Sequence, residues 1–200
     1  MNRFSSTVSS SRLDIQWQRL DQPAIERATV FAENRGWILA GVVDGTLETG
    51  AVYQVRYSVR CAGDWTTREA VVDGHLGDAP ISIALERDAA TSTWTLNGEP
   101  QPQVKGCIDV DLGFSPITNT LPIRRLDLPV REGADVRAAW LRFPEMRLEP
   151  LDQRYARVDV HCYRYESDRG RFSASLKVDE KGIVVQYDRY WVGSVMANGR

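Results

Sequence analysis

Two aspartates and two arginines lie close together in the middle of the chain, within residues 106–128. Asp109 and Asp111 are two residues apart, and Arg124 and Arg125 follow a Ser-Pro/Thr/Asn turn cluster. In a β-strand, positions i and i+2 point to the same face, so we expect the two carboxylates to lie side by side. Mutual repulsion and partial burial raise the pKa of at least one such carboxyl. A raised pKa suits a general acid or a group that binds a cation or a hydroxyl.

The same four residues also fit structural roles. The aspartates suit a strand end in solvent or a cap on the following turn, and a guanidinium forks two hydrogen bonds to a carboxylate as well as to a ligand phosphate. Consecutive helical residues diverge by about 100 degrees. We therefore expect only one of Arg124 and Arg125 to face the aspartates, and a buried Asp–Arg pair that holds a helix in place is an equal alternative.

A second candidate cluster is the segment 64–68, Asp-Trp-Thr-Thr-Arg. Tryptophan beside charged side chains is typical of sugar recognition, because the ring stacks on C–H surfaces while acids and arginine bond the hydroxyls. We therefore expect Asp64, Trp65 and Arg68 at a ligand. The carboxyl of Glu26, at the start of an apolar strand, is expected to point inward. A turn acid, a core tryptophan, an exposed arginine and a solvated glutamate are the alternatives.

Four tyrosines form an aromatic set in the C-terminal part of the chain: Tyr155, Tyr163, Tyr165 and Tyr187. Aromatic rings with a polar end suit a pocket for an amphiphile, and they equally suit a β core or a dimer interface. We place Tyr155 and Tyr165, together with Asn119, among the candidate ligand-binding residues.

The composition excludes several classes of function. The formal net charge is −2, so no basic field favours nucleic acid. The three cysteines and two histidines are scattered, without the spacing of a metal site. There is no G-x-S-x-G elbow, P-loop or G-x-G-x-x-G motif, so we assign no catalytic residue, metal or cofactor. No apolar run is long enough to span a bilayer.

The periodicity that must position these residues is that of strands. Alternation is clearest at 53–59, where Tyr53, Val55, Tyr57 and Val59 share one face. We expect about thirteen to fifteen strands with mostly antiparallel pairing, and so many strands must curl. Hairpin turns are expected at the Asp-Gly pairs 44–45 and 73–74 and at Asn-Gly 97–98.

A single helix is expected at 120–126. Thr118 or Asn119 is its predicted cap, and Pro122 falls in its first turn, where the missing N–H is harmless. We expect a flexible leader over 1–12, one β domain over 13–192 and a tail over 193–200. The N-terminus lacks the apolar core of a signal peptide, which predicts a cytoplasmic protein.

The run DVDLGFSPITNTLPIRRL at 109–126 resembles the signature of the bacterial family of putative glycolipid-binding proteins. Further parts of that pattern follow in order over residues 15–190: the segment from Trp17 to Glu26, YSVRCAGDWTTR at 57–68, DQRYARV at 152–158, YRYES at 163–167 and VDEKGIVVQY at 178–187. The resemblance implies a long antiparallel sheet wrapped around a single helix, a homodimer, and a functional role for Asp109 and Asp111.

The resulting hypothesis is a non-catalytic protein that binds a glycolipid or another sugar-bearing or phosphate-bearing amphiphile in an acidic pocket, without stable membrane insertion. The fold is expected to be a half-barrel or spiral β-roll wrapped around the helix, enclosing a pocket lined by Glu26, Asp64, Arg68, Asp109 and Asp111. One alternative is a carboxylate-dependent hydrolase acting on a glycosidic or phosphoester bond. The other is a structural dimer in which the acidic and basic residues only lock the fold.

Overall fold

Residues 12–196, which the computed structural model describes, form one sheet of fifteen strands. The mainly β fold expected from the sequence is confirmed. The strands are β1 (Leu13–Arg19), β2 (Ala24–Glu33), β3 (Gly36–Thr46), β4 (Val52–Ala62), β5 (Thr67–Leu76), β6 (Ala79–Asp88), β7 (Thr93–Leu96), β8 (Glu99–Pro100), β9 (Asp109–Leu112), β10 (Gly133–Arg142), β11 (Arg147–Asp159), β12 (Cys162–Ser167), β13 (Phe172–Val178), β14 (Val184–Tyr187) and β15 (Trp191–Met196).

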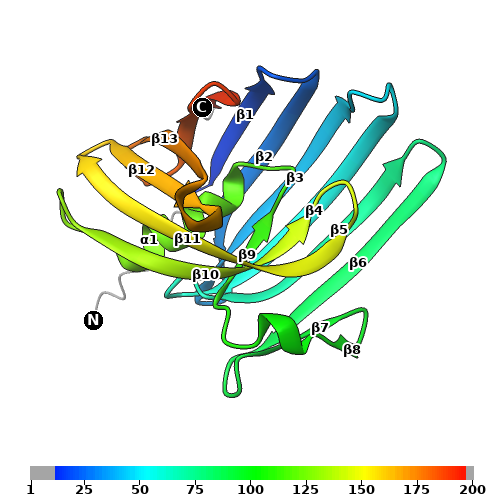
Figure 1. Cartoon of the computed structure of the whole chain (residues 1–200), viewed down its shortest axis with the longest axis horizontal. Helices are drawn as coiled ribbons and strands as arrows, with labels where there is room; N and C mark the ends of the chain where they lie inside the picture. The colour runs from blue at the N-terminus through cyan, green and yellow to red at the C-terminus, as the bar shows by residue number, and fades with distance from the viewer. Residues whose placement is uncertain (1–11, 197–200) are drawn as a thin grey trace, which may run out of the picture.

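The sheet is curled but does not close, and its two outermost strands are β8 and β9. The chain runs through β1 to β8, crosses back, and returns from β10 to β15, which pairs with β1. Neighbouring strands are antiparallel except for β9 and β10, which are parallel. Figure 1 shows the two halves of the sheet as separate walls, β2 to β6 on one side and β10 to β13 on the other.

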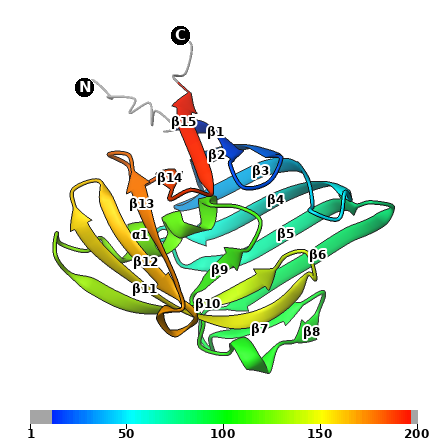
Figure 2. The same cartoon turned by 45° about the horizontal axis from the view of Figure 1, so that its top comes forward.

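The crossing segment occupies the inside of the curl. It contains the 3-10 turns η1 (Pro102–Val104) and η2 (Ile117–Asn119), strand β9 and the helix α1 (Thr120–Leu126), whose bounds agree with the prediction. Figures 1 and 2 show β9 between the two walls. The Val110 amide on β9 donates to Thr67 Oγ1 on β5 at 3.1 Å, so β9 is tied to the first wall as well as to β10.

Large aromatic side chains lie flat on the inner face because glycines oppose them on the neighbouring strand. Trp17 is paired with Gly193, and Tyr53 with Gly45. A Cβ atom added at either glycine would overlap the opposing ring. These close approaches explain two of the in-strand glycines, since any side chain there would displace a buried aromatic ring.

Two predicted hairpin turns were wrong. Asp44-Gly45 lies inside β3 and Asp73-Gly74 lies inside β5, and the chain turns after Thr46 and after Leu76 instead. Gly45 is needed under the Tyr53 ring, and Gly74, with φ of +145°, passes so close to the Gln54 carbonyl that a Cβ would overlap it. The glycines therefore serve close packing within strands. The Asn97-Gly98 turn, between β7 and β8, is confirmed.

The ordered sheet extends beyond its predicted end at residue 192, because β15 continues to Met196 and pairs along β1. The predicted tail over 193–200 is therefore wrong for residues 193–196. Most of the predicted leader, residues 1–11, lies outside the described residues. Every helix within 12–196 is too short or too polar to cross a membrane.

The contact between Gly45 and Tyr53 generates a first prediction. Gly45→Ala should lower the free energy of unfolding by about 1–3 kcal/mol, because the three atoms nearest the new Cβ all belong to the Tyr53 side chain. In a Tyr53→Leu background the same substitution should cost much less, since the ring is gone. Urea denaturation of the four proteins of this double-mutant cycle measures the coupling. An equal cost in both backgrounds would show that the aromatic contact is not the constraint.

Candidate functional site

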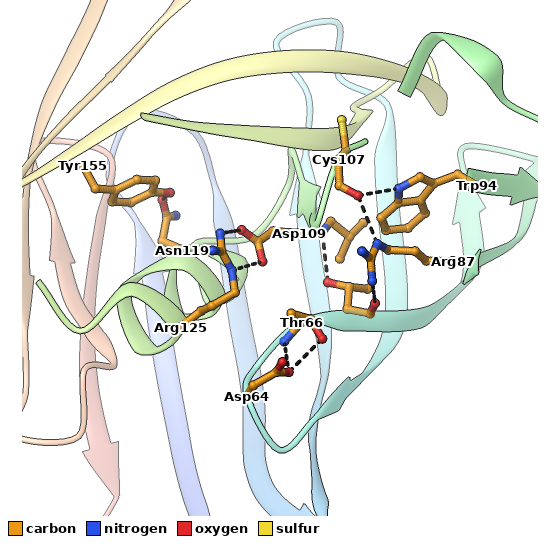
Figure 3. Close-up of polar contacts among 11 residues, drawn as sticks. Asp64, Thr66, Arg87, Trp94, Cys107, Asp109, Asn119, Arg125 and Tyr155 are labelled. Carbon is orange, nitrogen blue, oxygen red and sulfur yellow. Dashed lines mark hydrogen bonds and ion pairs between the residues drawn. The ribbon is translucent and has the colours of Figure 1, made fainter. Parts of the chain in front are cut away.

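Asp109 is neutralised by one arginine of the predicted pair. Arg125 Nε donates to Asp109 Oδ1 at 3.1 Å, and Arg125 Nη2 donates to Oδ2 at 2.5 Å. Figure 3 shows this forked pair between α1 and β9. Asp109 is 2% exposed, and burial raises the pKa of its carboxyl while Arg125 opposes the rise. This geometry fits the structural alternative, in which the pair fixes the helix against the strand.

Asp111 shares the strand face of Asp109 but has different surroundings. Its Oδ2 accepts a hydrogen bond of 2.6 Å from Gln153 Nε2 on β11, and the same nitrogen donates to the Tyr165 hydroxyl at 3.0 Å. No donor among residues 12–196 bonds the other oxygen, Oδ1. Part of Asp111 faces a cavity, and the protein around its remaining surface desolvates the carboxyl. This desolvation, assisted by the charge of Asp109, raises the pKa of Asp111 to about 6.

The cavity lies between the crossing segment and the second half of the sheet, and its volume is about 670 Å³. Its wall combines polar groups with aromatic rings. It is lined by Arg19, Asp111, Leu112, Gly113, Ser115, Asn119, Trp140, Arg142, Glu149, Pro150, Leu151, Tyr165, Ser167, Asp168, Phe172, Tyr187, Tyr190 and Trp191. Three residues predicted to bind a ligand are therefore brought together here: Asp111, Asn119 and Tyr165.

The other predicted tyrosine supports the cavity from behind. The Tyr155 hydroxyl donates to Asn119 Oδ1 at 2.8 Å, and Tyr155 is 1% exposed (Figure 3). Asn119 precedes α1, but its side chain makes no capping bond to the helix. Instead Asn119 Nδ2 donates to the Pro116 carbonyl at 3.1 Å, so the predicted capping role was wrong. Both bonds hold the amide at the cavity wall.

The segment 64–68 lies apart from the cavity. Trp65 stacks on Trp37 with ring centroids 4.5 Å apart, and the Arg124 guanidinium lies 5.1 Å from the centroid of Trp65. Because Trp37 covers one face of the Trp65 ring, the Arg124 guanidinium must lie over the opposite face. Neither face of Trp65 is then open to a sugar. Asp64 accepts hydrogen bonds from the Thr66 amide and hydroxyl (Figure 3), and these bonds lower the pKa of Asp64. Arg68 is exposed.

Glu26 does point inward, and it is fully buried. Its Oε1 accepts hydrogen bonds from the Tyr57 hydroxyl and, at 2.6 Å, from the Ser115 hydroxyl. Oε2 has no partner among the described residues. Burial raises the pKa of Glu26 to about 8, so the acid is mostly neutral at pH 7. Since Ser115 lines the cavity, Glu26 supports the wall from the core without lining it.

A comparison with known protein families identifies the family of this chain. A family described as "Putative glycolipid-binding" matches residues 14–193. The chain belongs to this family.

Structures similar to this member of the family include a crystal structure of a DUF1089 family protein from Pseudomonas aeruginosa. That protein is 32% identical over 84% of this chain and 91% of its own, with a TM-score of 0.74. A β-barrel-like protein of the domain of unknown function DUF1849 from Brucella abortus is 8% identical, covers 92% of this chain and 94% of its own, and has a TM-score of 0.52. The second likeness concerns the fold alone. A search of curated proteins finds no match.

Sequence reasoning missed much of the aromatic wall of this family member. Phe172, Tyr190, Trp191 and Trp140 line the cavity, and none of them was among the predicted ligand-binding residues. The available signal was the run Tyr187-Asp-Arg-Tyr-Trp191, in which aromatic residues flank a polar turn. Two arginines at strand ends, Arg19 and Arg142, were also missed. Within residues 12–196, no group of three acidic, histidine or cysteine side chains is placed to hold a metal ion.

The buried pair yields a second prediction. Asp109→Asn should lower the free energy of unfolding by about 3–5 kcal/mol, because it leaves the Arg125 charge without its partner. Asp135→Asn is the matched control, since Asp135 pairs with Arg154 at 2.9 Å but is 82% exposed, and it should cost little. Chemical denaturation of both variants checks the difference. Similar small losses in the two variants would contradict a structural role for Asp109.

A third prediction concerns pH and Glu26. Because the pKa of this group rises from an ordinary value of 4.5 to about 8 on folding, the folded state binds more protons between these values. The contribution of Glu26 to the free energy of unfolding is therefore fully present below pH 4.5. This contribution falls by roughly 3–5 kcal/mol as the pH rises to about 8. Glu26→Gln should remove that part of the slope.

Unfolding free energies measured from pH 5 to pH 9 test the effect of Glu26. Glu33→Gln on the same strand is the control, since Glu33 is partly exposed and paired with Arg60, and it should keep the wild-type slope. A wild-type slope that persists in Glu26→Gln would disprove the assignment, even if the variant is less stable at every pH.

Proposed function

We propose that the protein binds a sugar-bearing amphiphile in the cavity between the crossing segment and β10–β15. The observation that carries the proposal is the mixed lining of this cavity. Asp111, Asn119 and Tyr165 supply polar groups to the wall, and Phe172, Tyr187 and Trp191 supply aromatic rings. Sites for small molecules are mostly apolar concavities with a few placed polar groups, and about 300–1,000 Å³ is the usual range of volume.

Membership of the family supports the same proposal, because the family is described as glycolipid-binding. The aromatic wall also has the geometry of a rigid surface. Tyr187 and Tyr190 have ring centroids 5.9 Å apart, Phe172 and Tyr190 5.8 Å, and Tyr165 and Tyr187 6.0 Å. Interlocked rings lose little conformational freedom when a ligand binds, so they suit contact with an alkyl chain or with the C–H face of a sugar.

The homodimer implied by the family resemblance and the cytoplasmic location remain predictions that accompany this proposal. Light scattering of the purified protein measures the first, and cell fractionation measures the second. Fewer of the predicted acids line the cavity than the sequence-based hypothesis places there. Asp111 lines it, whereas Asp109 is paired with Arg125 and Glu26 lies behind Ser115.

A blocking variant tests the proposal. Leu151 on β11 lines the cavity, so Leu151→Trp should fill part of it. Native mass spectrometry of gently purified wild-type protein should show a co-purifying amphiphile, and titration calorimetry should show binding of octyl glucoside below its critical micelle concentration. Both should be lost, or weakened at least about tenfold, in Leu151→Trp.

Val71→Trp is the matched control, because Val71 is 45% exposed on β5 and does not line the cavity. It should bind as wild type does. Equal melting temperatures of the two variants would separate blocking from unfolding. Wild-type protein that carries no amphiphile and binds no octyl glucoside, or a Leu151→Trp variant that binds normally, would overturn the proposal.

A further inference from the structure

We propose that Asp111 recognises an uncharged, hydroxyl-bearing headgroup of the amphiphile and discriminates against a phosphate-bearing one. This inference rests on the proposed function and adds the chemical class of the headgroup. It is carried by unused hydrogen-bonding groups on Asp111 and Asn119, which both line the cavity.

Three polar side chains of the cavity wall, here called the floor, come from three different elements. Asp111 lies within β9, Asn119 lies in η2, and Tyr165 lies within β12. The two arginines of the wall come from strand ends, since Arg19 ends β1 and Arg142 ends β10.

The floor has hydrogen-bonding capacity that the protein does not use. Asp111 Oδ2 is occupied by Gln153, but no described donor bonds Oδ1, and Asp111 lines the cavity. Asn119 uses one N–H on the Pro116 carbonyl and its oxygen on Tyr155, which leaves its second N–H. A hydroxyl group both donates and accepts, so neighbouring sugar hydroxyls match one carboxylate oxygen and one amide N–H.

Gln153 holds the Asp111 carboxylate in one orientation. A single Nε2 atom donates to Asp111 at 2.6 Å and to Tyr165 at 3.0 Å, and Gln153 is 5% exposed. The carboxylate is thereby held with one oxygen tied back and the other presented to the cavity. Such preorganisation strengthens a hydrogen bond to a ligand because the side chain does not have to be ordered on binding.

An anionic headgroup is disfavoured at this floor. The carboxylate of Asp111 is desolvated, and its repulsion of a phosphate is screened less there than in water. The two arginines of the cavity wall are both paired. Arg19 is bonded to Asp21 at 2.7 Å, and Arg142 lies 3.5 Å from Glu145 and 3.8 Å from Glu149. Neither offers the floor an unpaired positive charge.

The aromatic rings of the wall suit the alkyl part of the ligand. Phe172, Tyr187, Tyr190 and Trp191 line the cavity, and the Arg19 guanidinium lies 5.6 Å from the centroid of the Trp191 ring. A cavity of about 670 Å³ has the capacity of a drug-sized ligand, so it takes a headgroup and part of an alkyl chain.

Calorimetry with two probes of equal chain length tests the charge selection. Wild-type protein should bind octyl glucoside at least about tenfold more tightly than octyl phosphate at pH 7.5. Asp111→Asn should weaken octyl glucoside about tenfold, since a charge-assisted hydrogen bond becomes a neutral one. It should also bind octyl phosphate more tightly than wild type does, so that the preference disappears. Asp73→Asn on β5, with its acid 56% exposed, should behave as wild type.

The outcomes distinguish this inference from the proposed function. If wild-type protein binds neither probe, both fail. If it binds octyl glucoside and is blocked by Leu151→Trp, but Asp111→Asn keeps the wild-type preference, the proposed function stands and the role of Asp111 is wrong. A wild-type preference for octyl phosphate would overturn the selection in the same way. Melting curves confirm that each variant is folded.

Discussion

The structure depends on placing a polar strand inside a curled sheet. β9 lies between the two walls, with Val110 and Leu112 in the main hydrophobic cluster and Asp109 and Asp111 on its other face. A carboxylate removed from water is costly unless it is paired or bonded, so each aspartate requires a partner. Asp109 obtains a full ion pair from Arg125, whereas Asp111 obtains one amide N–H from Gln153. The difference between these solutions separates a structural acid from one that faces a cavity.

The curl itself follows from long antiparallel pairing and from the size of the inner side chains. β1 and β15, the first and last strands, pair with each other. Trp17 on β1 reaches past this pairing and donates a hydrogen bond to the Val184 carbonyl on β14 at 2.8 Å. Glycine opposite Trp17 lets the indole lie on the sheet, so the inner surface can approach the crossing segment. The cavity lies where that segment does not fill the space against β10–β15. In its aromatic wall, Tyr187 and Trp191 come from β14 and β15, next to the pairing of β1 with β15.

Local signals predicted the elements well. The helix at 120–126 has Pro122 in its first turn and Ile123 and Leu126 on one side, and these features act within a few residues of each other. Strand β4 alternates buried and exposed along its whole length, as its sequence indicates. The predicted Asp-Gly turns were wrong because glycine occurs both in turns and at sites of close packing within strands. At Gly45 the close packing is against Tyr53, which lies on another strand and is not part of the local signal.

The candidate site was only partly predictable for the same reason. Spacing places Asp109 and Asp111 on one face, but it does not distinguish them, because the distinction comes from Arg125 on α1 and Gln153 on β11. Gln153 lies in the quoted family motif at 152–158, yet a lone glutamine carries no chemical signal until its two acceptors are known. Trp65 shows the opposite error. The charged residues around it in the sequence suggested stacking on a sugar, but its packing between Trp37 and Arg124 leaves no open ring face. A side chain that recognises a ligand must keep a bonding surface that its own fold leaves unused, and Asp111 Oδ1 meets this condition whereas the forked carboxylate of Asp109 does not.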